Sequence, residues 1–303
     1  MSGSRRRTDT NIQQSCFYKY TKSSICIFIN WNPLHIIRHL DIIKKDCFTI
    51  SILFQEVFYM FRFLMTAGFV ILFLIFSIPL LIIEWIIGKY NQSLKDKSCQ
   101  KIIRWAFSVC TSLAGVQVDY IGVENIPKEG SFLYVSNHRS YFDIVLTYLR
   151  FPRPTGYVAK VEMAKIPLLS TWMSNIHCLF LDRKNIKEGM KSIVKGINEI
   201  KSGTSICIFP EGTRGTEPNQ ILPFHEGSFR MAEKAKCPII PISITNSAAV
   251  WEDHMPFMKK AHVIIEFGEP VLLETLSKED MKFLGAYVRK VIINMQNKNK
   301  AMI

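Results

Sequence analysis

The 303-residue sequence lacks the cysteine spacings of a zinc or redox site. Its eight cysteines are scattered through the chain, and no two of them form a C-x-x-C pair. Zinc-binding and thiol-redox motifs need such pairs, so neither class of function is supported. We expect reduced, buried thiols in a cytosolic setting. The cysteines are Cys16, Cys26, Cys47, Cys99, Cys110, Cys178, Cys207 and Cys237.

The chain also has no long basic block, although its formal net charge is +13. The positive residues are spread along the sequence, and aromatic residues do not alternate with them as they do in proteins that bind single-stranded nucleic acid. We therefore expect no nucleic-acid partner. A basic and apolar chain fits the surface of an anionic membrane at least as well.

One run without charge stands out, Phe63 to Ile83. Its 21 residues would cross roughly 30 Å of hydrocarbon as a helix, and Arg62 and Lys89 flank it as interfacial anchors. Pro79 is expected to bend its last turns. A buried core helix is the alternative, and the pattern leaves open whether the segment spans the bilayer or only embeds. A second stretch, Cys99 to Leu113, has apolar residues at helical spacing and could lie in the interface.

Residues 1–59 show neither helical nor strand periodicity. We expect them to be an irregular leader, and we expect Met60 to be the true start. The text "MFRFLMTAGFVILF" is typical of a membrane N-terminus. The preceding "QEV" could be encoded by a purine-rich ribosome-binding stretch, so the leader would not belong to the fold. A genuine but irregular extension is the alternative. Residues 60–114 would then form the membrane-associated helices.

From residue 115 to residue 303, strand and helix patterns alternate. Apolar runs such as "SFLYVS", "TGYVAK", "SICIF" and "PIIPISI" predict strands. Helical stripes lie between them, for example Ile186 to Ile200. Strands separated by helix-length segments predict an α/β fold, a layered and largely parallel sheet flanked by helices.

His138 and Asp143 lie in the polar break "NHRSYFD" between two apolar runs. The two side chains can meet if His138 is in a loop and Asp143 in the first turn of a helix that Ser140 caps. Asp143 would then fix the tautomer of a histidine that acts as a general base. The alternative is structural: Asp143 completes a capping box and His138 is an ordinary loop histidine. No G-x-S-x-G nucleophile motif occurs, so such a base would have to activate a hydroxyl of the substrate.

A second polar group follows the predicted strand "SICIF". In "PEGTRG", two glycines flank Thr213 and Arg214, which allows a ligand to approach the backbone, and an arginine can bind a phosphate with two hydrogen bonds. Arg183 ends the strand "HCLFLDR". Ligands of open α/β sheets bind at such strand ends. Solvated surface arginines are the alternative at both positions.

"NHRSYFD" followed by "FPEGTRG" resembles the glycerolipid acyltransferase family, most closely its branch that acylates 1-acylglycerol 3-phosphate. "FLDR" and "PIIPISI" are similar to that family's second and fourth motifs, although His177 stands where the second motif usually opens with glycine. The resemblance runs from about residue 60 to the C-terminus. It implies His138 and Asp143 as catalytic residues, and it implies a substrate-binding set of Lys160, Arg183, Glu211, Gly212, Thr213 and Arg214.

The resemblance implies that an acyl group moves from acyl-CoA or acyl-carrier protein to the free hydroxyl of lysophosphatidic acid. Expected partners are these substrates and anionic membrane lipids, and no metal or bound cofactor is implied. The expected place is the cell membrane, with the catalytic domain on the cytoplasmic side. Acylation of glycerol 3-phosphate or of another lysolipid is the runner-up. A thioester or lipid hydrolase and a non-catalytic membrane-binding protein are more distant alternatives.

Overall fold

The computed structural model describes residues 33–217 and 220–303. The chain divides into two units, residues 1–51 and residues 52–303. Everything below concerns the second unit, apart from the first part of helix α1 (Pro33–Phe76). The expectations for residues 1–32, including buried thiols at Cys16 and Cys26, lie outside the described residues.

Helix α1 corrects the expectation for the part of the leader that is described. Residues 33–59 are helical, and the helix continues through Met60 without interruption, so the expected boundary at residue 59 is not an end of α1. The sequence pattern did not indicate this helix, because its polar and apolar residues are distributed on all sides and do not form one apolar stripe. A native start at Met60 stays a prediction. Within α1, Phe54–Phe76 is long and apolar enough to cross a membrane by length and composition.

The apolar run that begins at Phe63 is divided between two helices at Ser77, near the expected bend. Helix α1 ends at Phe76, and α2 (Ile78–Tyr90) begins with Pro79 in its first turn. Proline has no N–H and its ring collides with the preceding turn, which favours the break. The Ser77 hydroxyl donates to the Leu74 carbonyl at 2.9 Å and accepts a hydrogen bond from Trp172 Nε1 at 2.8 Å. Helix α3 (Gln92–Ala114) follows and contains the predicted helix Cys99–Leu113.

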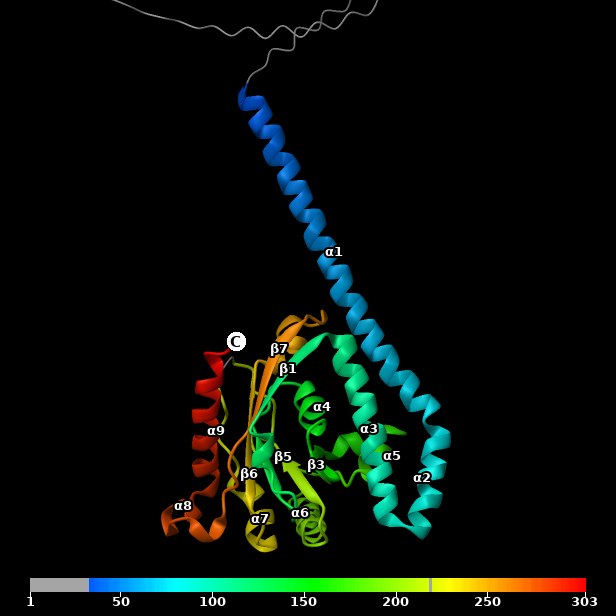
Figure 1. The fold of residues 1–303 in the computed structure, drawn as a ribbon, viewed down its shortest axis with the longest axis vertical. Coiled ribbons are helices and arrows are strands. Elements are labelled where there is room, and N and C mark those ends of the chain that lie inside the picture. Colours follow the sequence, from blue (N-terminus) through cyan, green and yellow to red (C-terminus); the bar gives the residue numbers. More distant parts are fainter. Residues whose placement is uncertain (1–32, 218–219) are drawn as a thin grey trace, which may run out of the picture. The chain divides into compact units, whose positions relative to one another are not determined.

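In the described part of the chain, seven strands form one sheet, which confirms the predicted α/β fold with a largely parallel sheet. Figure 1 shows the sheet with its helices. The order is β1-β7-β6-β2-β5-β3-β4, and every neighbouring pair is parallel except β6 and β7. β2 and β5 are buried on both faces, as strands between two helical layers are. The strands are β1 (Val116–Ile121), β2 (Leu133–Ser136), β3 (Thr155–Lys160), β4 (Leu179–Leu181), β5 (Ser205–Ile208), β6 (Ile239–Thr245) and β7 (Ala261–Phe267).

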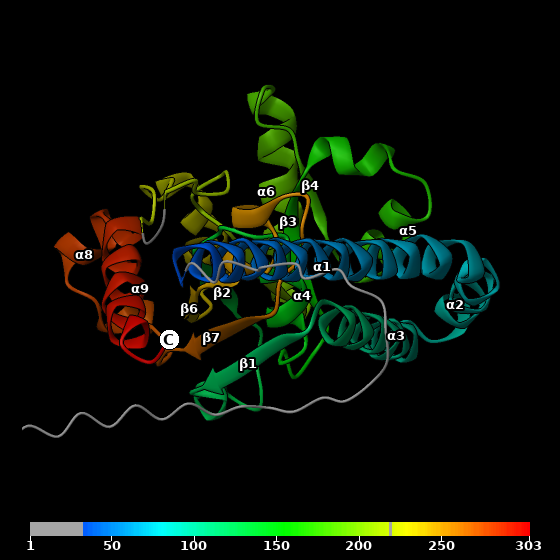
Figure 2. The same ribbon diagram turned by 90° about the horizontal axis from the view of Figure 1, so that it is seen from above.

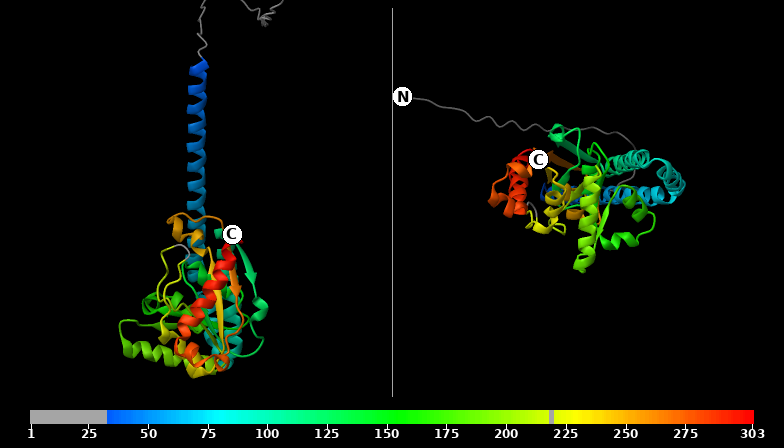
Figure 3. Two further views of the ribbon diagram at one scale, coloured as in Figure 1. Left: turned by 90° about the vertical axis from the view of Figure 1, so that its left-hand side faces the viewer. Right: turned by 90° about the horizontal axis from the view of Figure 1, so that it is seen from below.

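Helices cover both faces of the sheet. One face packs against α3, α4 (Phe142–Tyr148) and α5 (Leu169–Asn175), through residues such as Ile103, Leu146 and Trp172. The other packs against α6 (Ile186–Lys201), α7 (Arg230–Ala235) and α9 (Leu284–Lys300), which follows the short α8 (Lys278–Lys282). Figure 2 shows α9 on one side of the sheet and α3 and α4 on the other, and Figure 3 views the sheet from the side of α9.

Short 3-10 turns join these elements. They are η1 (Val123–Asn125), η2 (Val161–Lys165), η3 (Glu226–Phe229), η4 (Ser247–Val250), η5 (Glu252–His254) and η6 (Leu273–Thr275). Turns η4 and η5 lie between β6 and β7 and border the candidate site.

Candidate active site

The predicted site residues follow four strands that are neighbours in the sheet. β2, β5, β3 and β4 are adjacent and parallel, so their carboxyl ends meet at one edge. His138 follows β2, the Glu211–Arg214 segment follows β5, Lys160 ends β3, and Arg183 follows β4. This is the edge at which open α/β sheets bind ligands.

His138 and Asp143 contact one another across the start of α4. The Nδ1 atom of His138 lies 2.8 Å from Asp143 Oδ2. The same oxygen accepts hydrogen bonds from the backbone N–H groups of Arg139, at 2.7 Å, and Ser140, at 2.8 Å. One carboxylate oxygen therefore makes both the contact with His138 that the catalytic interpretation requires and the contact with the Ser140 N–H that the structural alternative requires. Ser140 is not the cap residue that was expected, because α4 begins at Phe142.

Three further contacts hold the His138 loop. Asn137 exchanges two hydrogen bonds of 2.9 Å with the backbone of Ile244 in β6. The His138 ring stacks on Phe209, with 4.1 Å between the ring centroids. The His138 backbone N–H donates to Glu211 at 2.7 Å. With Nδ1 on Asp143, the remaining nitrogen Nε2 has no hydrogen-bond partner among the described residues, and the side chain is 16% exposed. A histidine held this way can accept a proton at Nε2.

Glu211 lies within the site, and backbone groups occupy its side-chain oxygens. It is buried, and its two oxygens accept the backbone N–H groups of His138 and Leu222, each at 2.7 Å. Burial raises the pKa of Glu211, against the opposing effect of these two hydrogen bonds. A buried carboxylate would repel a phosphate. The geometry therefore gives Glu211 a positioning role, connecting the loops after β2 and β5.

Gly212 brings Arg183 close to the loop after β5. Its φ of +73° favours glycine, and a Cβ there would lie 3.2 Å from the His225 ring and 3.6 Å from Arg183 Nη1. Arg183 and Thr213 are both exposed. A cation, an exposed hydroxyl and an open backbone thus lie together at the sheet edge, an arrangement that suits an anionic group.

Arg214 and Lys160 are placed differently. The Arg214 guanidinium lies over the Tyr141 ring, 3.8 Å from its centroid, and Nη1 is 3.2 Å from Glu252 Oε1. Lys160 is exposed, and its ammonium pairs with Glu162 at 3.3 Å. Lys160 therefore lies at the same edge but pairs with none of the other predicted site residues.

Two residues of this region were missed by the sequence analysis, Glu252 and His225. Neither belongs to a recognised motif. Glu252 could have been found from its position, because an acidic pair, Glu252 and Asp253, follows the buried strand β6, which is parallel to β2. His225 follows a segment without a periodic pattern, and no sequence signal indicated it.

His177, the residue that departs from the family pattern, does not face this edge of the sheet. Its Nδ1 lies 3.0 Å from Glu199 Oε2 of α6, and its Nε2 lies 3.1 Å from Asp96 Oδ1 of α3. The Asp96 contact is a charge contact without hydrogen-bond alignment. Burial alone would lower the pKa of His177, but Asp96 and Glu199 together outweigh burial and raise it.

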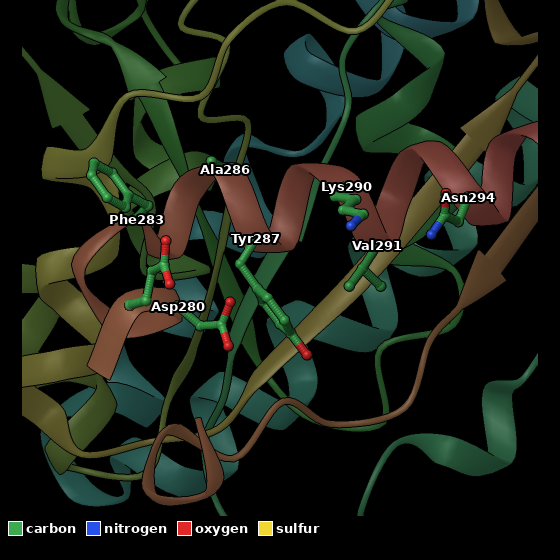
Figure 4. A pocket seen from close by; sticks show the side chains of 8 residues that line it. Asp280, Phe283, Ala286, Tyr287, Lys290, Val291 and Asn294 are labelled. Carbon is green, nitrogen blue, oxygen red and sulfur yellow. The ribbon is translucent and has the colours of Figure 1, made fainter. Parts of the chain in front are cut away.

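Among the described residues, no three His, Cys, Asp or Glu side chains are arranged to hold a metal ion. A hollow of about 460 Å³ lies along α8 and α9, lined by Asp280, Tyr287 and Lys290 among others (Figure 4). It contains none of the predicted site residues. A smaller hollow of about 350 Å³ is lined by Arg139, Thr245 and Lys300 among others, next to the His138 loop.

The five cysteines whose side chains are described are free and buried, in line with the expectation of reduced, buried thiols. They are Cys99, Cys110, Cys178, Cys207 and Cys237.

The chain is similar to known proteins. The family profile named Acyltransferase matches residues 117–245, a range that contains His138, Asp143, Arg183 and the Glu211–Arg214 segment. A 1-acyl-sn-glycerol-3-phosphate acyltransferase of Helicobacter pylori is 33% identical over 188 residues, which cover 59% of this chain and 78% of that protein.

Two other relatives carry the same description. The protein of Saccharomyces cerevisiae is 28% identical over 190 residues, or 62% of this chain and 61% of its own length. The "probable" enzyme of Mycoplasma pneumoniae is 32% identical over 180 residues, or 58% of this chain and 65% of its own length. This chain thus spans less than two thirds of these two relatives.

A solved structure has the same fold. The crystal structure of the 1-acyl-sn-glycerophosphate acyltransferase PlsC from Thermotoga maritima superimposes with a TM-score of 0.69 at 23% identity, covering 81% of this chain and 99% of that one. The fold, the profile and the Helicobacter relative confirm the resemblance found in the motifs, and this chain belongs to the Acyltransferase family.

Proposed function

We propose that the protein transfers a fatty acyl group from acyl-CoA or acyl-carrier protein to the sn-2 hydroxyl of 1-acylglycerol 3-phosphate, which gives phosphatidic acid for phospholipid synthesis. The observation that carries the proposal is the 2.8 Å contact of His138 Nδ1 with Asp143, because it leaves Nε2 as the base. The names of the relatives support the choice of acceptor.

In the proposed reaction, His138 Nε2 takes the proton of the acceptor hydroxyl while the oxygen attacks the thioester carbon. The carbon–sulfur bond then breaks, and the thiolate that leaves receives the proton from the imidazolium. Asp143 stabilises the imidazolium through Nδ1–H. The transfer needs no protein nucleophile, because the substrate supplies the attacking oxygen.

We assign the acceptor phosphate to the cationic part of the edge, the exposed Arg183 and the partly exposed Arg214, with Lys160 and Thr213 nearby in the sheet order. Gly212 allows close approach of the ligand to the backbone. Glu211 contributes by holding the His138 backbone and not by binding the phosphate.

The lipid acceptor would reach the site from a membrane. α1 and α2 expose many large apolar side chains. Five of them are between 56% and 74% exposed: Phe61, Leu64, Ile71, Phe76 and Ile82. Such a surface suits hydrocarbon more than water. We place the protein at the cell membrane, with residues 115–303 as the catalytic domain on the cytoplasmic side.

The test uses the purified full chain in detergent. It is given lysophosphatidic acid, glycerol 3-phosphate or another lysolipid, each with acyl-CoA or acyl-carrier protein, and products are identified by mass. Phosphatidic acid formed from lysophosphatidic acid is expected. A product from glycerol 3-phosphate alone would assign the runner-up acceptor, and free fatty acid as the main product would indicate a hydrolase.

A further inference from the structure

Glu252 connects the loop that carries His138 to Arg214 in the loop after β5. It lies in η5 between β6 and β7, and its side chain is only 13% exposed. Oε2 accepts a hydrogen bond from the Ser140 hydroxyl at 2.7 Å. Oε1 accepts the backbone N–H of Tyr141 at 2.7 Å and lies 3.2 Å from Arg214 Nη1. One carboxylate therefore contacts both the residues before α4 and the arginine after β5.

Arg214 is held on two sides by this arrangement. Glu252 contacts Nη1, and the Tyr141 ring lies under the guanidinium at 3.8 Å. An arginine has five N–H donors, so the contact with Glu252 leaves donors for a ligand. A long side chain that is ordered before the ligand arrives loses less freedom on binding. Only 34% of the Arg214 side chain is exposed, as expected for a side chain held against the protein.

The turn that carries Glu252 is also held by contacts of its neighbouring residues. Trp251, the preceding residue, lies between two aromatic rings: the Phe63 ring of α1, at 5.4 Å, and the Tyr141 ring, at 5.8 Å. The Met258 backbone N–H also reaches the Tyr59 carbonyl of α1, at 3.4 Å. Glu252 therefore has a defined position between the apolar helix and the loop that carries His138.

We propose that Glu252 is a positioning residue that orients Arg214 toward the phosphate of the acceptor lipid and thereby sets the affinity for the acceptor. This inference rests on the proposed function and deepens it. Glu252 does not touch the reacting atoms. Its charge matters through Arg214, while its hydrogen bonds to Ser140 and Tyr141 hold the loop.

The test is a double-mutant cycle of Glu252→Gln and Arg214→Ala in the full chain, measured by steady-state kinetics with lysophosphatidic acid and acyl-CoA. Glutamine keeps an acceptor oxygen and removes the charge. Glu252→Gln is expected to raise the KM for lysophosphatidic acid about three- to tenfold, the scale of one charged contact. The kcat and the KM for acyl-CoA should stay within about twofold. In the Arg214→Ala background, Glu252→Gln should have no further effect on the acceptor KM.

Asp253→Asn is the matched control. It removes the same charge from the next residue of the turn, where the carboxylate pairs with the Arg139 side chain at 3.0 Å instead of with Arg214. Its acceptor KM should equal that of the unaltered protein. Tyr141→Leu provides a second variant should Glu252→Gln fold poorly: it removes the ring under Arg214 and should also raise the acceptor KM.

The outcomes separate the two proposals. An active enzyme in which Glu252→Gln and Tyr141→Leu leave the acceptor KM unchanged would overturn the role of Glu252 alone. The same holds if Glu252→Gln raises the KM equally with and without Arg214, or if Asp253→Asn has the same effect. A protein that acylates no lysolipid at all would overturn the proposed function, and this inference with it.

Discussion

The imidazoles of His138 and His177 both contact carboxylates, but the surroundings of their second nitrogens differ. His138 has one nitrogen on Asp143 and the other without a partner, and it lies at the carboxyl ends of parallel strands. His177 has a carboxylate at each nitrogen, and it connects α3 to α6. Proton transfer requires a nitrogen that the substrate can reach. The comparison teaches that an acidic partner alone does not mark a catalytic histidine, and that the second nitrogen decides.

The largest expected effect is that of removing the His138 imidazole. His138→Ala should lower turnover by about two to four orders of magnitude, the range for loss of a general base. The ring is partly exposed and its loss should leave the fold intact. Acyl transfer and thermal unfolding are measured on the same preparation. Near-normal transfer by a folded His138→Ala protein would remove the catalytic role from this histidine.

Asp143→Asn should come next, with a loss of about two to three orders of magnitude in turnover. The amide carries no negative charge, so it no longer balances the charge of the imidazolium. The amide oxygen can still accept the backbone N–H groups of Arg139 and Ser140, so unfolding should change little. A large loss of stability with turnover preserved would leave Asp143 only with the structural role of holding the Arg139 and Ser140 backbone.

Arg214→Ala should have an intermediate effect that depends on the acceptor. Loss of a charge-assisted contact costs about 1.5–3 kcal/mol, or roughly tenfold to a hundredfold in the use of lysophosphatidic acid. Hydrolysis of the acyl donor by water involves no acceptor phosphate and should be affected far less. The two rates are measured side by side. Equal losses in both would argue against phosphate binding by Arg214.

His177→Asn should act on stability and not on turnover, and only at low pH. Asparagine tolerates the φ of +62° at this position and removes the titrating ring. Because the folded pKa of His177 is raised, its charge stabilises the fold fully below the unfolded pKa, near 6.5. That stabilisation is lost as the pH rises through the folded pKa. We expect a deficit of about 1 kcal/mol at pH 5 that disappears at alkaline pH.

Unfolding of both proteins by urea across this pH range measures the difference. A deficit that is the same at all pH values would mean that packing, and not charge, is the contribution of His177. A large loss of acyl transfer in His177→Asn would contradict a purely structural role of His177.

The residues at the sheet edge were predictable from the sequence, because their positions depend on local patterns. Apolar strands ending at polar residues indicated where His138, Arg183 and Arg214 would gather, and the parallel order of the strands followed from the helices between them. The Asp143 contact was also predictable, since the residues that cap a short helix lie close together in the chain.

What the sequence did not indicate depends on contacts between distant segments. Glu211 has the residue type of a ligand-binding group, but only the fold shows that two backbone N–H groups occupy its oxygens. Glu252 belongs to the site because η5 packs beside Tyr141; the acidic pair in "WEDH" indicates a place near the sheet edge but not this contact. The helix before residue 60 was missed for a different reason, because its apolar residues do not form the single stripe that marks a helix packed on a protein core.

The hydrogen bond from Trp172 to Ser77 has a consequence for kinetics. It connects the junction between α1 and α2 to α5. The apolar helices and the sheet edge therefore move together, unlike a membrane anchor joined to its domain by a flexible linker. With these helices in a bilayer, the site stays at one depth and meets its acceptor by lateral diffusion. Turnover would then follow the mole fraction of lysolipid in the surface and not its concentration in the bulk, so dilution with inert lipid would slow the reaction while the total lysolipid stays constant.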